Sequence, residues 1–86
     1  MLTQVKEWEI FSENGMWKIR KNFVFKDFKE ALSFVNKIGA LAEEENHHPD
    51  ILIHSYKKVS ITTYTHAVSG LTENDLILAA KIDTLR

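Results

Sequence analysis

Cysteine is absent from this 86-residue sequence, which excludes a disulfide framework, thiol catalysis and thiolate ligands for a metal. Long apolar runs are absent too. The N-terminal residues contain no stretch of signal-peptide length, and no segment reaches the roughly 18 apolar residues that cross a membrane. The formal net charge is only −1, so no whole-chain basic field points to direct binding of nucleic acid. We therefore expect a cytoplasmic protein that has neither a membrane nor a nucleic acid as its partner.

Turn residues are also scarce, with one proline and three glycines, so the turns are easy to place. Asn14-Gly15 favours a type I′ hairpin between strands near 8–13 and 17–25. In the second of these strands apolar residues alternate with polar ones, which predicts one buried face. The apolar residues of this face are Trp17, Ile19, Phe23 and Phe25. Lys21 is the exception on the apolar parity, which is compatible with an edge or a bulge.

The first predicted helix begins at Asp27, which has capping-box spacing with Glu30. Apolar residues then recur at helical spacing, as expected of one core-facing stripe. The residues of this stripe are Phe28, Ala31, Leu32, Val35, Ile38, Gly39 and Ala42. The helix must end by His47 or His48, because the residue before Pro49 is pushed out of the helical region.

A second strand pair is predicted near 51–56 and 58–66, where Ile, Val, Thr and Tyr are frequent. Thr72 then caps a last helix, with Asp75 at its third position. The resulting order is ββαββα within one domain, residues 1–86. This order predicts an α+β fold, in which a four-stranded antiparallel sheet carries both helices on one face.

Three histidines are the candidates for chemistry. His47 and His48 lie at the predicted helix end and His66 lies at a strand end, places that commonly line clefts. Glu43 precedes His47 by one helical turn, so we expect the two side chains to meet. A nearby carboxylate and a helix C-terminus both favour the charged imidazolium, which suits proton transfer near neutral pH. His54 lacks such support and is expected to be structural or exposed.

Non-catalytic interpretations of these histidines stay open. By strand parity alone, His66 is more often a surface residue than a catalyst. A metal is not expected, because the adjacent His47 and His48 rarely point at one ion and the i, i+4 pairing of zinc motifs is absent. No glycine-rich phosphate loop and no serine or cysteine nucleophile motif occurs. The chemistry that remains is proton transfer by histidine and carboxylate groups.

A longer pattern surrounds the three histidines. It consists of Glu43-Glu44-Glu45-Asn46-His47-His48-Pro49-Asp50, Tyr56, Val59, Thr65-His66, Gly70-Leu71-Thr72 and Asp75. In this combination the chain resembles the pterin-4a-carbinolamine dehydratase family over nearly its whole length. Two departures stand out. Only seven residues precede Trp8, so we expect the N-terminal helix of that family to be truncated or absent, and Ile51 stands where the family commonly has Trp.

The resemblance implies the antiparallel sheet described above and the loss of water from a 4a-hydroxytetrahydropterin, without a metal or other cofactor. It implies that His47, His48 and His66 supply acid–base catalysis and pterin binding. It also implies supporting or substrate-binding roles for Glu43, Pro49, Thr65 and Asp75. In this family pattern Asp75 lies beside the active site and orients a histidine. A homodimer or homotetramer is expected. The alternatives are a non-catalytic module that binds a pterin or a protein partner on the same fold, and a role with another pterin such as molybdopterin.

Overall fold

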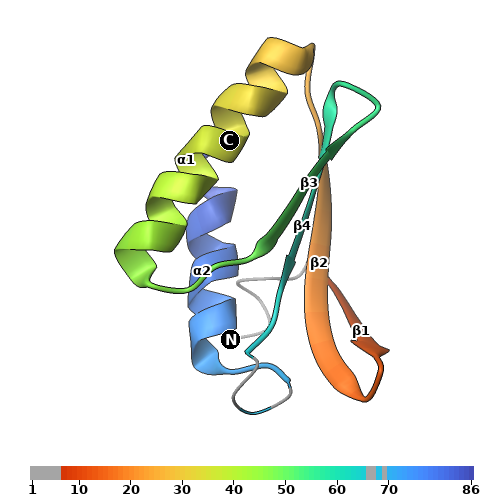
Figure 1. Cartoon of the computed structure of the whole chain (residues 1–86), viewed down its shortest axis with the longest axis vertical. Coiled ribbons are helices and arrows are strands. Elements are labelled where there is room, and N and C mark those ends of the chain that lie inside the picture. Colours follow the sequence, from red (N-terminus) through yellow and green to blue (C-terminus); the bar gives the residue numbers. More distant parts are fainter. Residues whose placement is uncertain (1–6, 66–67, 69) are drawn as a thin grey trace.

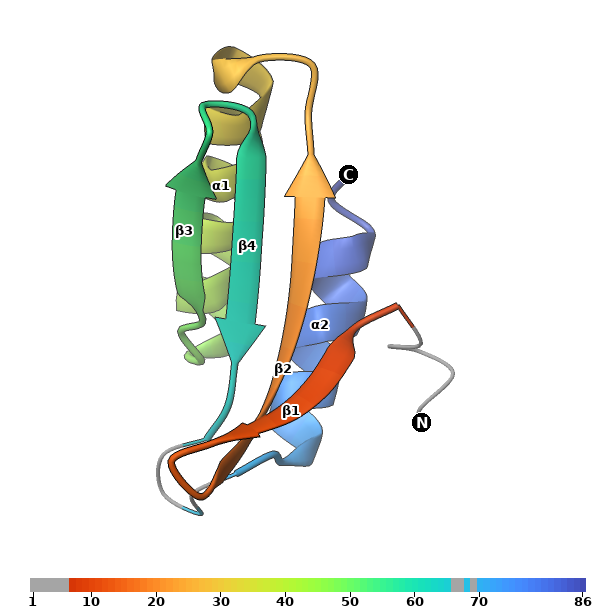
Figure 2. The same ribbon diagram turned by 90° about the vertical axis from the view of Figure 1, so that its right-hand side faces the viewer.

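The computed structural model describes residues 7–65, 68 and 70–86. Its elements follow the predicted order ββαββα, and both helices lie on one face of a four-stranded antiparallel sheet (Figures 1 and 2). The elements are β1 (Glu9–Glu13), β2 (Met16–Val24), α1 (Phe28–Glu45), β3 (Asp50–His54), β4 (Lys58–Thr63) and α2 (Glu73–Asp83). No helix among these residues is long and apolar enough to cross a membrane. The predicted fold class is confirmed.

The sheet has the strand order β1-β2-β4-β3, so β2 and β4 are its central strands. The first hairpin turns where it was predicted to turn: Glu13 pairs with Met16, and Asn14 and Gly15 have φ values of 54° and 78°. Positive φ at both central residues is what a type I′ turn requires. Lys21 pairs with Ile61 in regular register, so no bulge explains its place on the apolar parity. The β1 ladder ends at Arg20, so Lys21 lies where β2 is paired with β4 alone, as the edge interpretation expects.

Both strands of the second pair are shorter than predicted. β3 ends before Ser55 and Tyr56, which have φ values of 50° and 52° and therefore form a left-handed turn instead of continuing the strand. β4 ends at Thr63, and beyond it Thr65 forms an isolated bridge with Gly70. The turn at Ser55 and Tyr56 was not predicted, because the β-branched and aromatic residues of this region favour strands.

The start of α1 is confirmed, since Asp27 is the N-cap and its Oδ1 accepts a 2.9 Å hydrogen bond from the Glu30 backbone N–H. The predicted core stripe is only partly right. Phe28 and Leu32 are 49% and 41% exposed. The buried residues of α1 are Ala31, Phe34, Ile38 and Ala42. The helix is thus rotated about its axis, relative to the prediction, so that Phe34 enters the core. The predicted stripe did not include Phe34.

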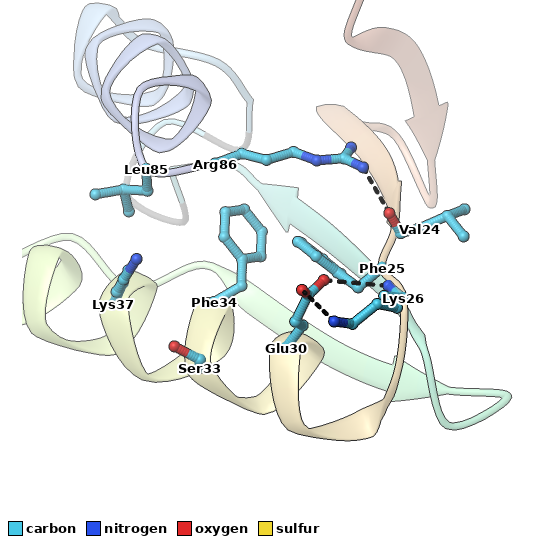
Figure 3. A pocket seen from close by; sticks show the side chains of 9 residues that line it. All are labelled: Val24, Phe25, Lys26, Glu30, Ser33, Phe34, Lys37, Leu85 and Arg86. Carbon is cyan, nitrogen blue, oxygen red and sulfur yellow. Dashed lines mark hydrogen bonds and ion pairs between the residues drawn. The ribbon is translucent and has the colours of Figure 1, made fainter.

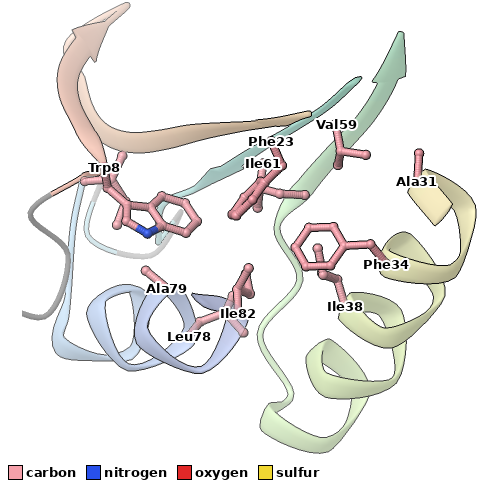
Figure 4. Close-up of a cluster of buried hydrophobic side chains, with 11 residues drawn as sticks. Trp8, Phe23, Ala31, Phe34, Ile38, Val59, Ile61, Leu78, Ala79 and Ile82 are labelled. Carbon is pink, nitrogen blue, oxygen red and sulfur yellow. The ribbon is translucent and has the colours of Figure 1, made fainter. Parts of the chain in front are cut away.

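The hydrophobic core fills the space between the sheet and the two helices (Figure 4). Phe34 of α1 lies against two aromatic residues, with ring centroids 4.8 Å from Phe23 of β2 and 4.9 Å from Phe25, which directly follows β2. The other buried members of this cluster are Trp8, Ile19, Ala31, Ile38, Val59, Ile61, Leu78, Ala79 and Ile82. This packing holds the end of α1 and the start of α2 in fixed positions, which matters for the candidate site.

Lys21 faces the helices and ends in a polar cluster at the C-terminal end of α2. Its Nζ lies 2.8 Å from Asp83 Oδ1, and the Trp8 indole N–H donates to the same carboxylate, at 3.2 Å to Oδ2. The lysine therefore keeps strand parity because its long side chain carries the charge past the apolar residues to a carboxylate.

Candidate active site

The end of α1 sets the direction of the histidines. The helix ends at Glu45, and Asn46 has a left-handed conformation with φ 52° and ψ 41°. The His47 N–H donates to the Ala42 carbonyl at 3.1 Å, and the Asn46 N–H donates to the Glu43 carbonyl at 3.3 Å. This pair of bonds is the Schellman motif, in which Asn is the usual substitute for Gly at the left-handed position. His47 is consequently the first residue to point away from the helix.

The turn brings His47 to α2 and not to Glu43. His47 Nε2 lies 2.6 Å from Asp75 Oδ1, and the His47 side chain is only 16% exposed. The Glu43 carboxylate instead meets His48, with 2.5 Å between Oε2 and Nε2, and both of these side chains are largely exposed. The predicted contact between Glu43 and His47 is therefore wrong. It assumed one continuous helix from 43 to 47, and the helix ends before His47.

Asp75 is completely buried, and its two oxygens are surrounded by donors. Oδ1 accepts from the Thr63 hydroxyl at 2.6 Å and faces His47 Nε2, while Oδ2 accepts from the Thr65 hydroxyl at 2.7 Å and from the Thr72 N–H at 3.0 Å. Burial raises the pKa of this carboxyl, but the hydrogen bonds from Thr63, His47, Thr65 and Thr72 outweigh it and hold the pKa below its ordinary value.

This ionisation state fixes the direction of the bond to His47. An ionised carboxylate can only accept hydrogen bonds, so His47 must donate its Nε2 proton to Asp75. The neutral ring then carries its lone pair on Nδ1, the nitrogen that makes no hydrogen bond within the described part of the chain. Asp75 therefore caps α2 through the Thr72 N–H and also orients His47, so both roles considered for it are present in one side chain.

The remaining predicted residues are distributed around this pair. Thr65 contacts Asp75 as described, and Pro49 is half-buried at the entry to β3. His66 lies outside the described residues. The buried Thr63 was missed by sequence reasoning, although a signal exists: it shares strand parity with Val59 and Ile61 and is the polar member of that inward row.

Three hollows in the described residues lie away from His47, and two of them adjoin strands of the sheet. One has a volume of about 320 Å³ and lies between the first half of α1, the end of β2 and the C-terminal residues (Figure 3). The other has a volume of about 660 Å³ and lies on the open face of the sheet, beside His54, Ser60 and Asn22. His54 Nε2 lies 3.2 Å from Ser60 Oγ there. Neither hollow is lined by a predicted catalytic residue.

Comparison with known proteins shows the family to which the chain belongs. A sequence model described as "Pterin 4 alpha carbinolamine dehydratase" matches residues 1–85. The chain is 48% identical over 82 residues to the "Putative pterin-4-alpha-carbinolamine dehydratase" of Rubrobacter xylanophilus, an alignment that covers 95% of this chain and 73% of that protein. It is 49% identical over 78 residues to the protein of the same name from Alkaliphilus metalliredigens, covering 91% and 67%.

Two solved structures share the fold. One is titled as a transcriptional coactivator/pterin dehydratase from Brucella melitensis, with a TM-score of 0.82 and 30% identity over 96% of this chain and 88% of that one. The other is titled as a pterin dehydratase-like protein identified as a RuBisCO assembly factor in the alpha-carboxysome. It has a TM-score of 0.77 and 25% identity over 92% of this chain and 88% of that one.

Proposed function

Because the chain belongs to the pterin-4a-carbinolamine dehydratase family, we propose that it removes water from a 4a-hydroxytetrahydropterin to give a quinonoid dihydropterin. One observation carries the proposal: His47 is held by the buried Asp75 carboxylate with Nδ1 left for another partner. A histidine oriented in this way is equipped to move a proton at neutral pH, and proton transfer is what this reaction requires.

The reaction has two proton-transfer steps. The N5 lone pair of the pterin expels the 4a-hydroxyl, which leaves as water only if an acid protonates it. A base then takes the N5 proton, so that the product and one water molecule account for every atom. A positioned general acid or base contributes about 10²–10⁴-fold to the rate of each step. In the proposal His47 and His66 divide these two roles.

The other candidate residues support this pair in the proposal. The His48 side chain is largely exposed and lies beside Glu43. In the proposal this exposure lets His48 bind or orient the pterin at the rim of the site. Thr65 steadies the second oxygen of Asp75. Pro49 keeps His48 out of the helical conformation beyond the end of α1 and directly precedes β3. We also propose that the chain works as a homodimer or homotetramer in the cytoplasm, which light scattering and cell fractionation would test.

The test is turnover of a 4a-hydroxytetrahydropterin by the wild type and by His47→Ala and His66→Ala. His54→Ala is the matched control, because it removes the imidazole on the open face of the sheet, away from Asp75. We expect losses of at least about 100-fold in the first two variants and wild-type rates in the control. The mechanism is wrong if both variants stay folded and keep wild-type rates.

A second candidate is a non-catalytic module on the same fold. The observation that favours it is the similarity to structures titled as a transcriptional coactivator and as a RuBisCO assembly factor. A binding measurement with several pterins, including molybdopterin precursors, distinguishes the dehydratase from the non-catalytic module. Absence of pterin binding at micromolar protein, together with stable association with a defined protein partner, would establish the module.

A further inference from the structure

We propose that Thr63 is a positioning residue that shares one oxygen of Asp75 with His47 and thereby weakens the hold of Asp75 on the His47 proton. The proposal rests on the proposed function in that it assigns a working nitrogen and a working pH range to His47. It adds a residue to which neither the sequence pattern nor the family resemblance gave a role.

Thr63 cannot touch a substrate directly. Its exposed fraction is 0%, and it stands in the inward row of β4 with Val59 and Ile61. Valine has nearly the same shape as threonine but lacks the hydroxyl, so the hydroxyl is what distinguishes Thr63 from its apolar neighbours in this row. Among the described residues the hydroxyl has one hydrogen-bond partner, Asp75 Oδ1, to which it donates at 2.6 Å. A buried hydroxyl needs such a partner, which means that Thr63 and Asp75 are coupled.

Oδ1 of Asp75 is the oxygen at which Thr63 and His47 compete. Both approach it at 2.6 Å, whereas Oδ2 is occupied by Thr65 and the Thr72 N–H. A hydrogen bond to a carboxylate stabilises its negative charge and lowers its affinity for a further proton. The Thr63 hydroxyl therefore leaves less of that charge for an imidazolium at His47. Without it, Asp75 would favour the protonated ring more strongly.

The direction of the effect does not depend on which proton-transfer role His47 has. If His47 is the base, the neutral ring is active, and a stronger hold on the proton moves the acidic limb of the rate profile to higher pH. If His47 is the acid, the protonated ring is active, and the basic limb moves to higher pH. Loss of the Thr63 hydroxyl shifts the affected limb upward in both cases.

Two other acidic groups in the described residues around this site have partners of their own. Glu43 is paired with His48 at the end of α1, and Glu45 with Lys81 between α1 and α2. A substitution at Thr63 alters none of these pairs, which isolates Asp75 as the group through which the effect reaches His47.

The test compares Thr63→Val, which removes the hydroxyl and keeps the shape, with Thr63→Ser, which keeps the hydroxyl. Thr62→Val is the matched control, because Thr62 is the neighbouring residue of β4 and faces the open side of the sheet. For Thr63→Val we expect the affected limb of the kcat/KM profile to move upward by about 0.5–1 pH unit. Thr63→Ser and Thr62→Val should keep the wild-type profile.

A second readout follows the His47 ring directly by long-range ¹H–¹⁵N NMR in the free protein. The wild type should show the tautomer with its proton on Nε2, and Thr63→Val should move the midpoint of the His47 titration upward by the same amount. If the wild-type protein turns over no pterin, the proposed function is refuted. The NMR titration of His47 still tests the role of Thr63 in that case, because it needs no turnover.

The inference fails on any of three results. These are a wild-type tautomer with the proton on Nδ1, an unchanged or lowered titration midpoint in a folded Thr63→Val, and a Thr63→Ser variant that behaves like the valine variant. Should Thr63→Val not fold, Thr63→Ala removes the same hydroxyl with less crowding, and the wild-type tautomer remains decisive.

Discussion

Replacing Asp75 with Asn should destabilise the protein by about 2–3 kcal/mol near pH 7. The carboxylate is fully buried and accepts side-chain hydrogen bonds from Thr63, Thr65 and His47. A hydrogen bond to a charged group contributes about 1.5–3 kcal/mol and one between neutral groups about 0.5–1.5 kcal/mol. The amide weakens all three bonds, so about 3 kcal/mol is lost, and the easier burial of a neutral group offsets a part of that loss.

The stability lost in Asp75→Asn should depend on pH, in a direction that follows from the pKa of Asp75 in the wild type. Hydrogen bonds hold this pKa in the folded protein below its value in the unfolded chain, which is about 3.9. A carboxyl of this kind stabilises the fold fully above the unfolded value and loses that contribution as the pH falls through the folded value. Below about pH 4 the stability gap between wild type and Asp75→Asn should therefore narrow, because the wild-type side chain becomes neutral as well.

Urea unfolding followed by fluorescence of the buried Trp8 at pH 7, 5 and 3 measures this gap. Glu73→Gln is the matched control, since Glu73 is an exposed acid in the same first turn of α2 and its loss removes only the helix-dipole contribution of about 0.3–1 kcal/mol. A gap for Asp75→Asn no larger than that of the control, or a gap that widens between pH 5 and pH 3, would refute the reasoning.

Two further substitutions test the fold around the site. Asp83→Ala removes the acceptor of the Trp8 indole N–H and the counter-charge of Lys21, so we expect a loss of about 1–2 kcal/mol in urea unfolding; a loss below 0.5 kcal/mol would show that water replaces the carboxylate. Asn46→Ala should lower stability by about 1 kcal/mol because alanine resists the left-handed turn, while Asn46→Gly should equal the wild type; equal stabilities of the two variants would contradict this account.

Much of the fold could be predicted because its turns and caps are encoded locally. Asn14-Gly15 defines a two-residue hairpin, Asp27 begins α1, and Thr72 precedes α2, each through bonds between residues no more than four apart. The rotation of α1 about its axis could not be predicted in this way. It depends on how Phe34 packs against Phe23 and Phe25, at the end of β2 and directly after it, which is a property of the assembled core.

The candidate site was predicted in composition and not in its contacts. The residues His47 and Asp75 were named, but their 2.6 Å contact joins elements 28 positions apart and follows from the packing of α1 beside α2. The assumed partner, Glu43, was chosen by helical spacing, and one left-handed residue at Asn46 ended that spacing. An Asn before a His-His-Pro run is itself a local signal for such a helix end.

The two candidate functions place different demands on Asp75. A binding module needs only a start for α2, which the exposed Glu73 already favours by its charge at the helix N-terminus. Burying a charged network brings little net stability, and apolar residues of similar volume often serve as well or better in such positions. A small domain with a limited core has little reason to keep such a network for stability alone. What Asp75 adds to capping is a fixed direction for His47. A fixed imidazole is useful to a catalyst of proton transfer, and the buried carboxylate therefore favours the dehydratase over the module.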